Sequence, residues 1–296
     1  MTINLKGYKN NVGYRRIGDK IAVQLKENAE EQEQKHEQDP GKLAMMQAMA
    51  RFLEEKRIVG ERLAQVKHKI GIYSAKGGVG KTTIAVNVAY ALSTMGYKVG
   101  LMDVDIDCPN VTLFIGLSEK IPQTYPLKPV EHQGVKVIST AMFVDDAKKP
   151  IIWRGPIQSK MIKDFLARTD WGELDYLIMD LAPGTSDTAL TILQILNLDG
   201  FLIVTTPQRI SALNATRSGA MVKRLNSSLL GVVENMSDGS KGTAEDVAKE
   251  LGTVVLGRVK KDQKFNDFSD AGKVPVLTDD GIRQGFIDII KRFINK

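Results

Sequence analysis

One stretch of sequence decides the fold: Ile70-Gly71-Ile72-Tyr73-Ser74-Ala75 followed by Lys76-Gly77-Gly78-Val79-Gly80-Lys81-Thr82-Thr83. An apolar strand, a glycine-rich loop and a helix pattern over Thr82–Thr94 follow one another directly. This order is the context of a phosphate-binding loop, in which glycines let backbone N–H groups surround phosphate oxygens at the start of a helix. We therefore expect the residues of Lys76–Thr83 to bind ATP, with Lys81 at the β- and γ-phosphates and the Thr82 hydroxyl on Mg²⁺.

The rest of the chain from Ile70 alternates between short apolar strands and helices. Such alternation is typical of an α/β fold, with a mostly parallel sheet covered by helices on both faces. The expected strands are Ile70–Ser74, Lys98–Asp103, Val135–Ser139, Tyr176–Asp180, Phe201–Thr205, Leu229–Glu234 and Val254–Leu256. The expected helices between them include Thr82–Thr94, Ile157–Ala167, Ala212–Leu225 and Ala244–Leu251. We expect residues 70–296 to form one domain.

Carboxylates follow two of these strands. Asp103 and Asp105 lie at the end of Lys98–Asp103, and Asp180 ends Tyr176–Asp180 ahead of a loop through Pro183-Gly184. Since the carboxyl ends of parallel strands meet beside the phosphate loop, we expect Asp103, Asp105 and Asp180 to lie where Mg²⁺ and the attacking water bind. Asp180, which ends an apolar strand, is expected to hold Mg²⁺ through water. The alternative is a solvated acidic turn.

Composition narrows the class of protein. The 296 residues are 43% hydrophobic and 26% charged, as in an ordinary globular protein. The one cysteine excludes an intramolecular disulfide, and also a Cys-x-x-Cys pair within one subunit. No apolar run reaches the roughly 18 residues that a membrane span needs, and no signal peptide is visible. We expect a cytoplasmic protein.

Residues 1–69 form an extension outside this pattern. Its charge is net +5 over Met1–Lys26 and −5 over Glu27–Asp39, and an amphipathic helix is expected over Leu43–Val66, with a break near Gly60. The basic segment is consistent with nucleic-acid or membrane binding, or with a solvated tail that the acidic run neutralises. The helix is expected to pack on the main domain or on a partner.

The second lysine of the loop, Lys76, makes the chain resemble the deviant-Walker ATPases, which include MinD, ParA, the nitrogenase iron protein and Mrp. The closer resemblance is to the Mrp/ApbC type. It rests on the segments Ile152–Pro156, Trp171–Tyr176, Asp180–Asp187, Thr205–Gln208, Gly231–Met236, Leu256–Arg258 and Asp270–Val276. The general loop pattern has Gly at the position of Ala75, and the family pattern has Pro at that of Ala182.

This resemblance implies cofactors, partners and roles. ATP and Mg²⁺ are implied, with a homodimer in which Lys76 reaches the partner's phosphates. Asp105 is implied as the water-positioning residue of the first switch segment, and Asp103 as support for the magnesium shell. Asn235 is implied to contact adenine through its amide, and Pro207 to line the same pocket.

One departure from the family concerns iron–sulfur binding. Proteins of the Mrp/ApbC type usually carry Cys-x-x-Cys shortly after the segment that here ends at Met236, and two such pairs hold a bridging cluster. Here Ser237–Gly242 follows instead, and Cys108 is the chain's cysteine. A dimer would offer two thiolates where four are usual, so a cluster on this chain is doubtful.

Two functions follow from these patterns. The first is an ATPase of the iron–sulfur carrier type that acts on a protein client or on a cluster held with a partner. The second is a positioning ATPase like MinD or ParA, which would use the basic N-terminus or the apolar stripe of Gly281–Lys296 on a membrane or on DNA. The alternative for that stripe is a final helix packed on its own domain. An ATP-dependent amide ligase on the same fold has no specific support.

Overall fold

The computed structural model describes residues 40–105, 108–121, 125–143, 155–184, 193–195, 198–239 and 243–294. The chain divides into two compact units, Met1–Glu55 and Lys56–Lys296. Most of the first unit lies outside the described residues, and so do Asp107, Trp153, Arg154, Ser186, Asp187 and the segment 240–242.

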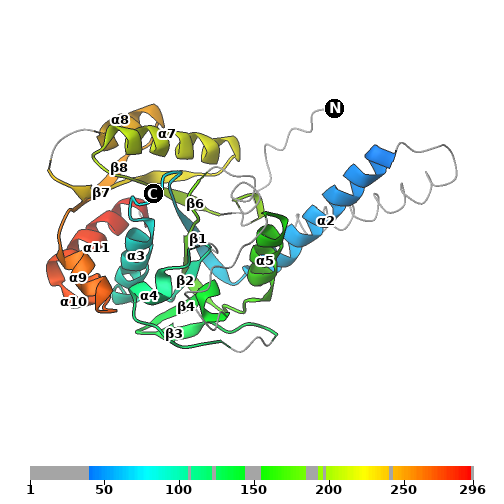
Figure 1. The fold of residues 1–296 in the computed structure, drawn as a ribbon, viewed down its shortest axis with the longest axis horizontal. Helices are drawn as coiled ribbons and strands as arrows, with labels where there is room; N and C mark the ends of the chain where they lie inside the picture. The colour runs from blue at the N-terminus through cyan, green and yellow to red at the C-terminus, as the bar shows by residue number, and fades with distance from the viewer. Residues whose placement is uncertain are drawn as a thin grey trace. The chain divides into compact units, whose positions relative to one another are not determined.

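The second unit is built on one eight-stranded sheet in the order β3-β4-β2-β5-β1-β6-β7-β8 (Figure 1). The strands are β1 Val66–Tyr73, β2 Val99–Asp103, β3 Val130–His132, β4 Val135–Ser139, β5 Leu174–Asp180, β6 Gly200–Thr205, β7 Leu229–Ser237 and β8 Val255–Lys260. All neighbouring pairs are parallel except β3 with β4. The expected mostly parallel α/β sheet is confirmed.

Helices cover both faces of this sheet. Right-handed crossovers require this, because the chain first runs from β1 to β2 and β4 and then turns back through β5 to β6, β7 and β8. Figure 1 shows α3 and α11 on one face and α7 and α8 on the other. The helices are α2 Pro40–Arg62, α3 Lys81–Thr94, α4 Val111–Phe114, α5 Gly155–Arg168, α7 Arg209–Arg224, α8 Thr243–Glu250, α9 Lys264–Asp270, α10 Pro275–Thr278 and α11 Asp280–Ile294, with a 3₁₀ turn at Thr140–Phe143.

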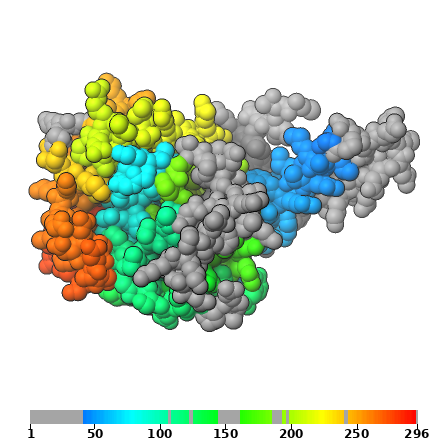
Figure 2. Space-filling model, in the orientation of Figure 1, coloured from blue at the N-terminus to red at the C-terminus, as the bar shows by residue number. Residues whose placement is uncertain are grey.

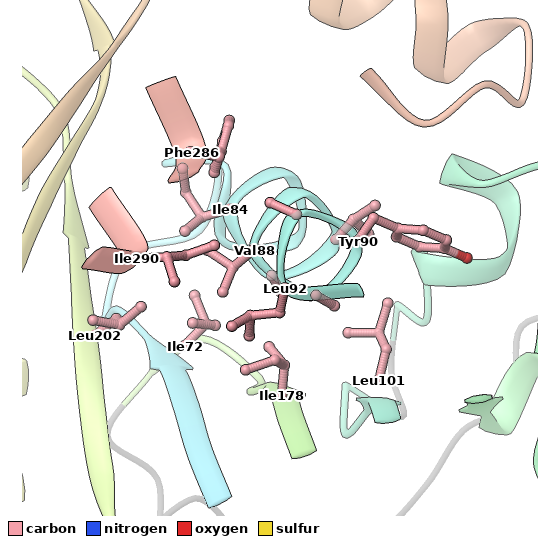
Figure 3. Close-up of a cluster of buried hydrophobic side chains, with 14 of the residues drawn as sticks. Ile72, Ile84, Val88, Tyr90, Leu92, Leu101, Ile178, Leu202, Phe286 and Ile290 are labelled. Carbon is pink, nitrogen blue, oxygen red and sulfur yellow. The ribbon is translucent and has the colours of Figure 1, made fainter. Parts of the chain in front are cut away.

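Helix α3 forms the centre of the hydrophobic core, because it lies directly over the middle strands. Its side chains Ile84, Val88 and Leu92 are fully buried. Figure 3 shows them between the strand residues Ile72, Leu101, Ile178 and Leu202 and the α11 residues Phe286 and Ile290. A helix packed in this way fixes the loop that precedes it, which is the phosphate loop.

The C-terminal helix α11 belongs to this core. Of its apolar stripe, Phe286, Ile289, Ile290 and Phe293 are at most 5% exposed, and Ile282 is half-buried against the same core. The interpretation of this stripe as a final helix packed on its own domain is therefore confirmed. Among the described residues, no helix combines the length and the apolar character needed to cross a bilayer.

Three local expectations near the N-terminus were wrong. Helix α2 runs through Gly60 without the expected break, and it ends at Arg62, short of the expected Val66. Strand β1 begins at Val66, four residues before the expected Ile70. The early start has a tertiary cause, since Val66 and His68 pair with Leu174 and Tyr176 of β5. Burial of the expected helical stripe is also partial: Val59 and Leu63 are buried, whereas Met49 and Leu53 are exposed.

Candidate nucleotide site

The glycine-rich loop turns sharply from β1 into α3. Gly78 has φ 76° and Gly80 φ 83°, in the left-handed region that glycine adopts without a steric penalty. Gly80 is the N-cap of α3 and has no side chain to cap the helix, and the described residues show no side-chain cap hydrogen bond at this N-terminus. Unpaired N–H groups at a helix N-terminus form a site for phosphate.

Side chains from helix α7 hold the first half of the loop. The Ala75 N–H donates to Ser218 Oγ over 2.6 Å. The Lys76 ammonium donates to Gln208 Oε1 at 3.1 Å and to Ser211 Oγ at 3.2 Å. In Figure 2 the cyan surface of the segment around residue 80 borders the yellow surface of α7. Sequence reasoning missed these contacts, since no motif marks Ser218 or Ser211.

Asp180 and Thr82 meet beneath the loop. The Thr82 hydroxyl donates to Asp180 Oδ2 over 2.5 Å. Asp180 is buried, and within the described part of the chain its other oxygen, Oδ1, has no hydrogen-bond partner. Burial raises the pKa of Asp180 to about 7, although the Thr82 hydrogen bond and the Lys81 charge oppose the shift. A buried, partly unpaired carboxylate beside a threonine hydroxyl fits a hard cation such as Mg²⁺.

Lys81 is the first residue of α3 and is only 8% exposed. Burial lowers its pKa, while the carboxylates of Asp180 and Asp105 oppose this shift. A largely buried ammonium at the start of the helix lies where phosphate charge would be neutralised.

Asp103 is fully buried on β2, and its Cα is paired in register with that of Asp180 on β5. Its Oδ1 accepts from the Asp105 N–H at 3.1 Å. Its Oδ2 accepts from the Val111 N–H and the Ser139 hydroxyl, each at 3.1 Å. Burial first, and then the negative charge of Asp180, raise the pKa of Asp103 well above its ordinary value. Asp103 thus links the first switch segment to β4 through the Ser139 hydroxyl. The sequence did not reveal this role of Ser139.

Asp105 and Cys108 lie on that switch segment. Asp105 is half-buried, and its Oδ1 accepts from the Cys108 N–H at 3.1 Å. Cys108 is exposed and free of disulfide bonding.

The Asp105 N–H bonds to Asp103, which is paired in register with Asp180. Asp180 in turn bonds to Thr82, the residue after Lys81. The structure therefore brings Asp105, Asp180 and Lys81 to one end of the sheet.

The second switch segment is anchored from β1. The hydroxyl of buried Tyr73 donates to the Gly184 carbonyl over 2.6 Å. Burial raises the pKa of Tyr73, so the phenol keeps the proton that it donates. The sequence did not predict this contact, because no motif distinguishes Tyr73 from the other residues of its strand.

Pro207 and Asn235, the two residues expected to contact the adenine base, lie on different elements. Pro207 is half-buried in the turn between β6 and α7. Asn235 is 4% exposed near the end of β7, and its Nδ2 donates to the Val79 carbonyl at 2.9 Å. Thr83, also expected at the nucleotide, is half-buried on α3, where its carbonyl accepts from Asn87.

The site has a glycine-rich loop between a central parallel strand and a buried helix. A lysine, a threonine and a strand-end aspartate meet behind this loop. This arrangement defines a P-loop nucleotide-binding protein. The chain matches the ParA family model described as "NUBPL iron-transfer P-loop NTPase" over residues 65–294. It belongs to that family.

Relatives and solved structures agree with this assignment. An iron–sulfur cluster carrier protein of Methanocaldococcus jannaschii is 42% identical over 80% of this chain and 88% of the relative. One of Aquifex aeolicus is 38% identical over 78% and 68%. A nucleotide-binding protein of Archaeoglobus fulgidus, solved with ADP, has a TM-score of 0.64 at 31% identity over 74% of this chain and 92% of that one. MinD of Pyrococcus furiosus shares the fold at 19% identity, with a TM-score of 0.61 over 78% and 99%.

Proposed function

We propose that this protein is an ATP-hydrolysing switch of the iron–sulfur cluster carrier type. The observation that carries the proposal is the convergence of Lys81, Thr82 and Asp180 behind a loop that ends in the open N-terminus of α3. Its family membership and the ADP found in the Archaeoglobus fulgidus neighbour support the same reading.

Each part of the site has a distinct task in this proposal. The backbone of Lys76–Thr83 and the Lys81 ammonium bind the phosphates, and Thr82 and Asp180 hold Mg²⁺, which neutralises phosphate charge when bound. Asp105 orients a water for attack on the γ-phosphorus. The bond to the bridging oxygen breaks, giving ADP, inorganic phosphate and a proton. Turnover is slow and coupled to a rearrangement of the dimer.

Dimerisation is assigned to Lys76. A single phosphate loop has no required role for a second lysine beside Lys81. In this chain Lys76 is half-buried on Gln208 and Ser211 of its own subunit. We propose that with ATP bound it leaves these partners and reaches the phosphates of a second copy.

The cargo of this switch is an iron–sulfur cluster held with the thiolates of a partner or client protein. The relatives are named as cluster carriers, whereas this chain supplies Cys108 alone, exposed beside the carboxylate of Asp105. The domain division proposed with this function is an ATPase domain over 70–296 and an extension over 1–69, in a cytoplasmic protein.

The positioning function has less support. Its C-terminal apolar stripe is buried in the core, so it is not free to bind a membrane. Its other element, the basic segment Met1–Lys26, lies outside the described residues.

Two substitutions test the ATPase assignment. Lys81→Ala should abolish tight ATP binding in calorimetry, because it removes the buried ammonium. Asp105→Ala should keep binding but stop phosphate release, because it removes only the group that orients water. Normal hydrolysis by Lys81→Ala would show that the site has been misassigned.

A further inference from the structure

We propose that Asn235 is a positioning residue that sets the shape of the phosphate loop through Val79 and Gly80. The inference rests on the proposed function, in which this loop binds ATP. It gives Asn235 a task that does not depend on the nucleobase. Its evidence is one buried hydrogen bond and one close approach.

The hydrogen bond joins β7 to the middle of the loop. Asn235 Nδ2 donates to the Val79 carbonyl at 2.9 Å, and both residues are at most 4% exposed. The peptide group is planar, with C=O and N–H on opposite sides. Holding the Val79 carbonyl toward Asn235 therefore turns the Gly80 N–H away from β7. A phosphate cradle depends on such fixed N–H directions.

The close approach is at Gly80. A Cβ on this residue would lie 2.1 Å from Asn235 Nδ2, a distance that no side chain can occupy. Gly80 also has φ 83°. The amide thus lies against the Cα of the residue that immediately precedes Lys81, so it constrains the point where the loop becomes helix α3.

The end of β7 keeps Asn235 in place. On one side Glu234 is fully buried and accepts from the Ser237 hydroxyl at 2.7 Å, and it also pairs with Arg258 at 3.3 Å. On the other side Met236 has φ 54°, a left-handed conformation that is unfavourable for a non-glycine residue. Contacts that hold Glu234 and Ser237 maintain this kink and with it the direction of the Asn235 side chain.

The test compares a ligand that has a base with one that has none. We would titrate the full chain with ATP and with inorganic tripolyphosphate, each with Mg²⁺, in a calorimeter. Loss of a buried hydrogen bond in Asn235→Ala should weaken both ligands by about tenfold. The control is Thr169→Ala, which removes an equally buried side chain whose hydroxyl donates to the Phe165 carbonyl at 2.7 Å; neither residue belongs to the Lys76–Thr83 loop. It should lower the melting temperature and leave both affinities unchanged.

The outcomes separate the two ideas. If Asn235→Ala weakens ATP alone, Asn235 reads the base and the inference is overturned. Failure of tripolyphosphate to bind the wild type overturns it as well. If the wild type binds neither ligand, the proposed ATPase function fails first.

A second variant isolates the steric contact. Gly80→Ala should weaken tripolyphosphate strongly when Asn235 is present and several-fold less in the Asn235→Ala background, because the clashing amide is gone. Equal losses in both backgrounds would contradict contact between the two residues as the cause.

Discussion

The two hydrogen bonds that hold Lys76 on its own subunit should oppose ATP-driven dimerisation. In the free chain Lys76 donates to Gln208 and Ser211, and to reach a partner's phosphates it has to give up both contacts. Gln208→Ala removes the hydrogen bond between Lys76 and the Gln208 side chain. This bond exists in the monomer but not in the proposed dimer, so the substitution destabilises the monomer only. At about 1 kcal/mol for a partly exposed hydrogen bond, and with two subunits per dimer, the dimer should gain about 2 kcal/mol, or about 30-fold in Kd.

The assay is sedimentation over a range of protein concentrations with saturating ATP, in an Asp105→Ala background that stops turnover. Gln284→Ala is the matched control, because Gln284 on α11 bonds only to exposed Asp288 among the contacts described. It should leave Kd unchanged, and Lys76→Ala should stay monomeric. If Gln208→Ala dimerises no more tightly than the control, the idea that the monomer restrains Lys76 is wrong.

Two further substitutions test the site and the core. Asp180 has a pKa of about 7 in the fold against an ordinary value of 3.8, so the folded state holds a proton that the unfolded state releases between these values. The resulting stability is present below pH 3.8 and is lost as pH rises through 7. At pH 8 without nucleotide or metal, Asp180→Asn should therefore raise the free energy of unfolding by about 1–4 kcal/mol, measured with urea; a loss would contradict the burial argument. Phe286→Ala should lower the free energy of unfolding by about 3–5 kcal/mol, because the Phe286 side chain is buried between α11 and α3. A negligible decrease would show that α11 is not a core helix.

Much of this fold could be predicted from local sequence. Parallel strands that are buried on both faces are visible in the sequence as short apolar runs. The predicted strand Val135–Ser139, for example, has the same first and last residues as β4. The phosphate loop is equally local, since its glycines and lysines are contiguous. The edge strand β3 was missed because its three residues are not buried and carry no apolar run.

The contacts that shape the site could not be predicted in this way. Ser139, Ser218 and Asn235 reach the switch or the loop from β4, α7 and β7. Each makes one of these hydrogen bonds to a residue far away in the sequence. Serines and asparagines also occur elsewhere in the described part of the chain without such a role. Only the packing of the sheet and helices selects Ser139 and Ser218. The family resemblance did place Asn235 at the site, but in contact with adenine, whereas the structure shows its amide on the Val79 carbonyl.

The central claim is that this chain supplies the ATP-driven switch while the thiolates for a cluster come from another protein. The most direct test is anaerobic reconstitution of the protein alone, with iron and sulfide counted per dimer and the product examined by Mössbauer spectroscopy, for the wild type and for Cys108→Ser. We expect no stable four-iron cluster in either protein, with nearly unchanged ATPase activity in Cys108→Ser. A stable four-iron cluster at one per dimer that disappears in Cys108→Ser would contradict the claim.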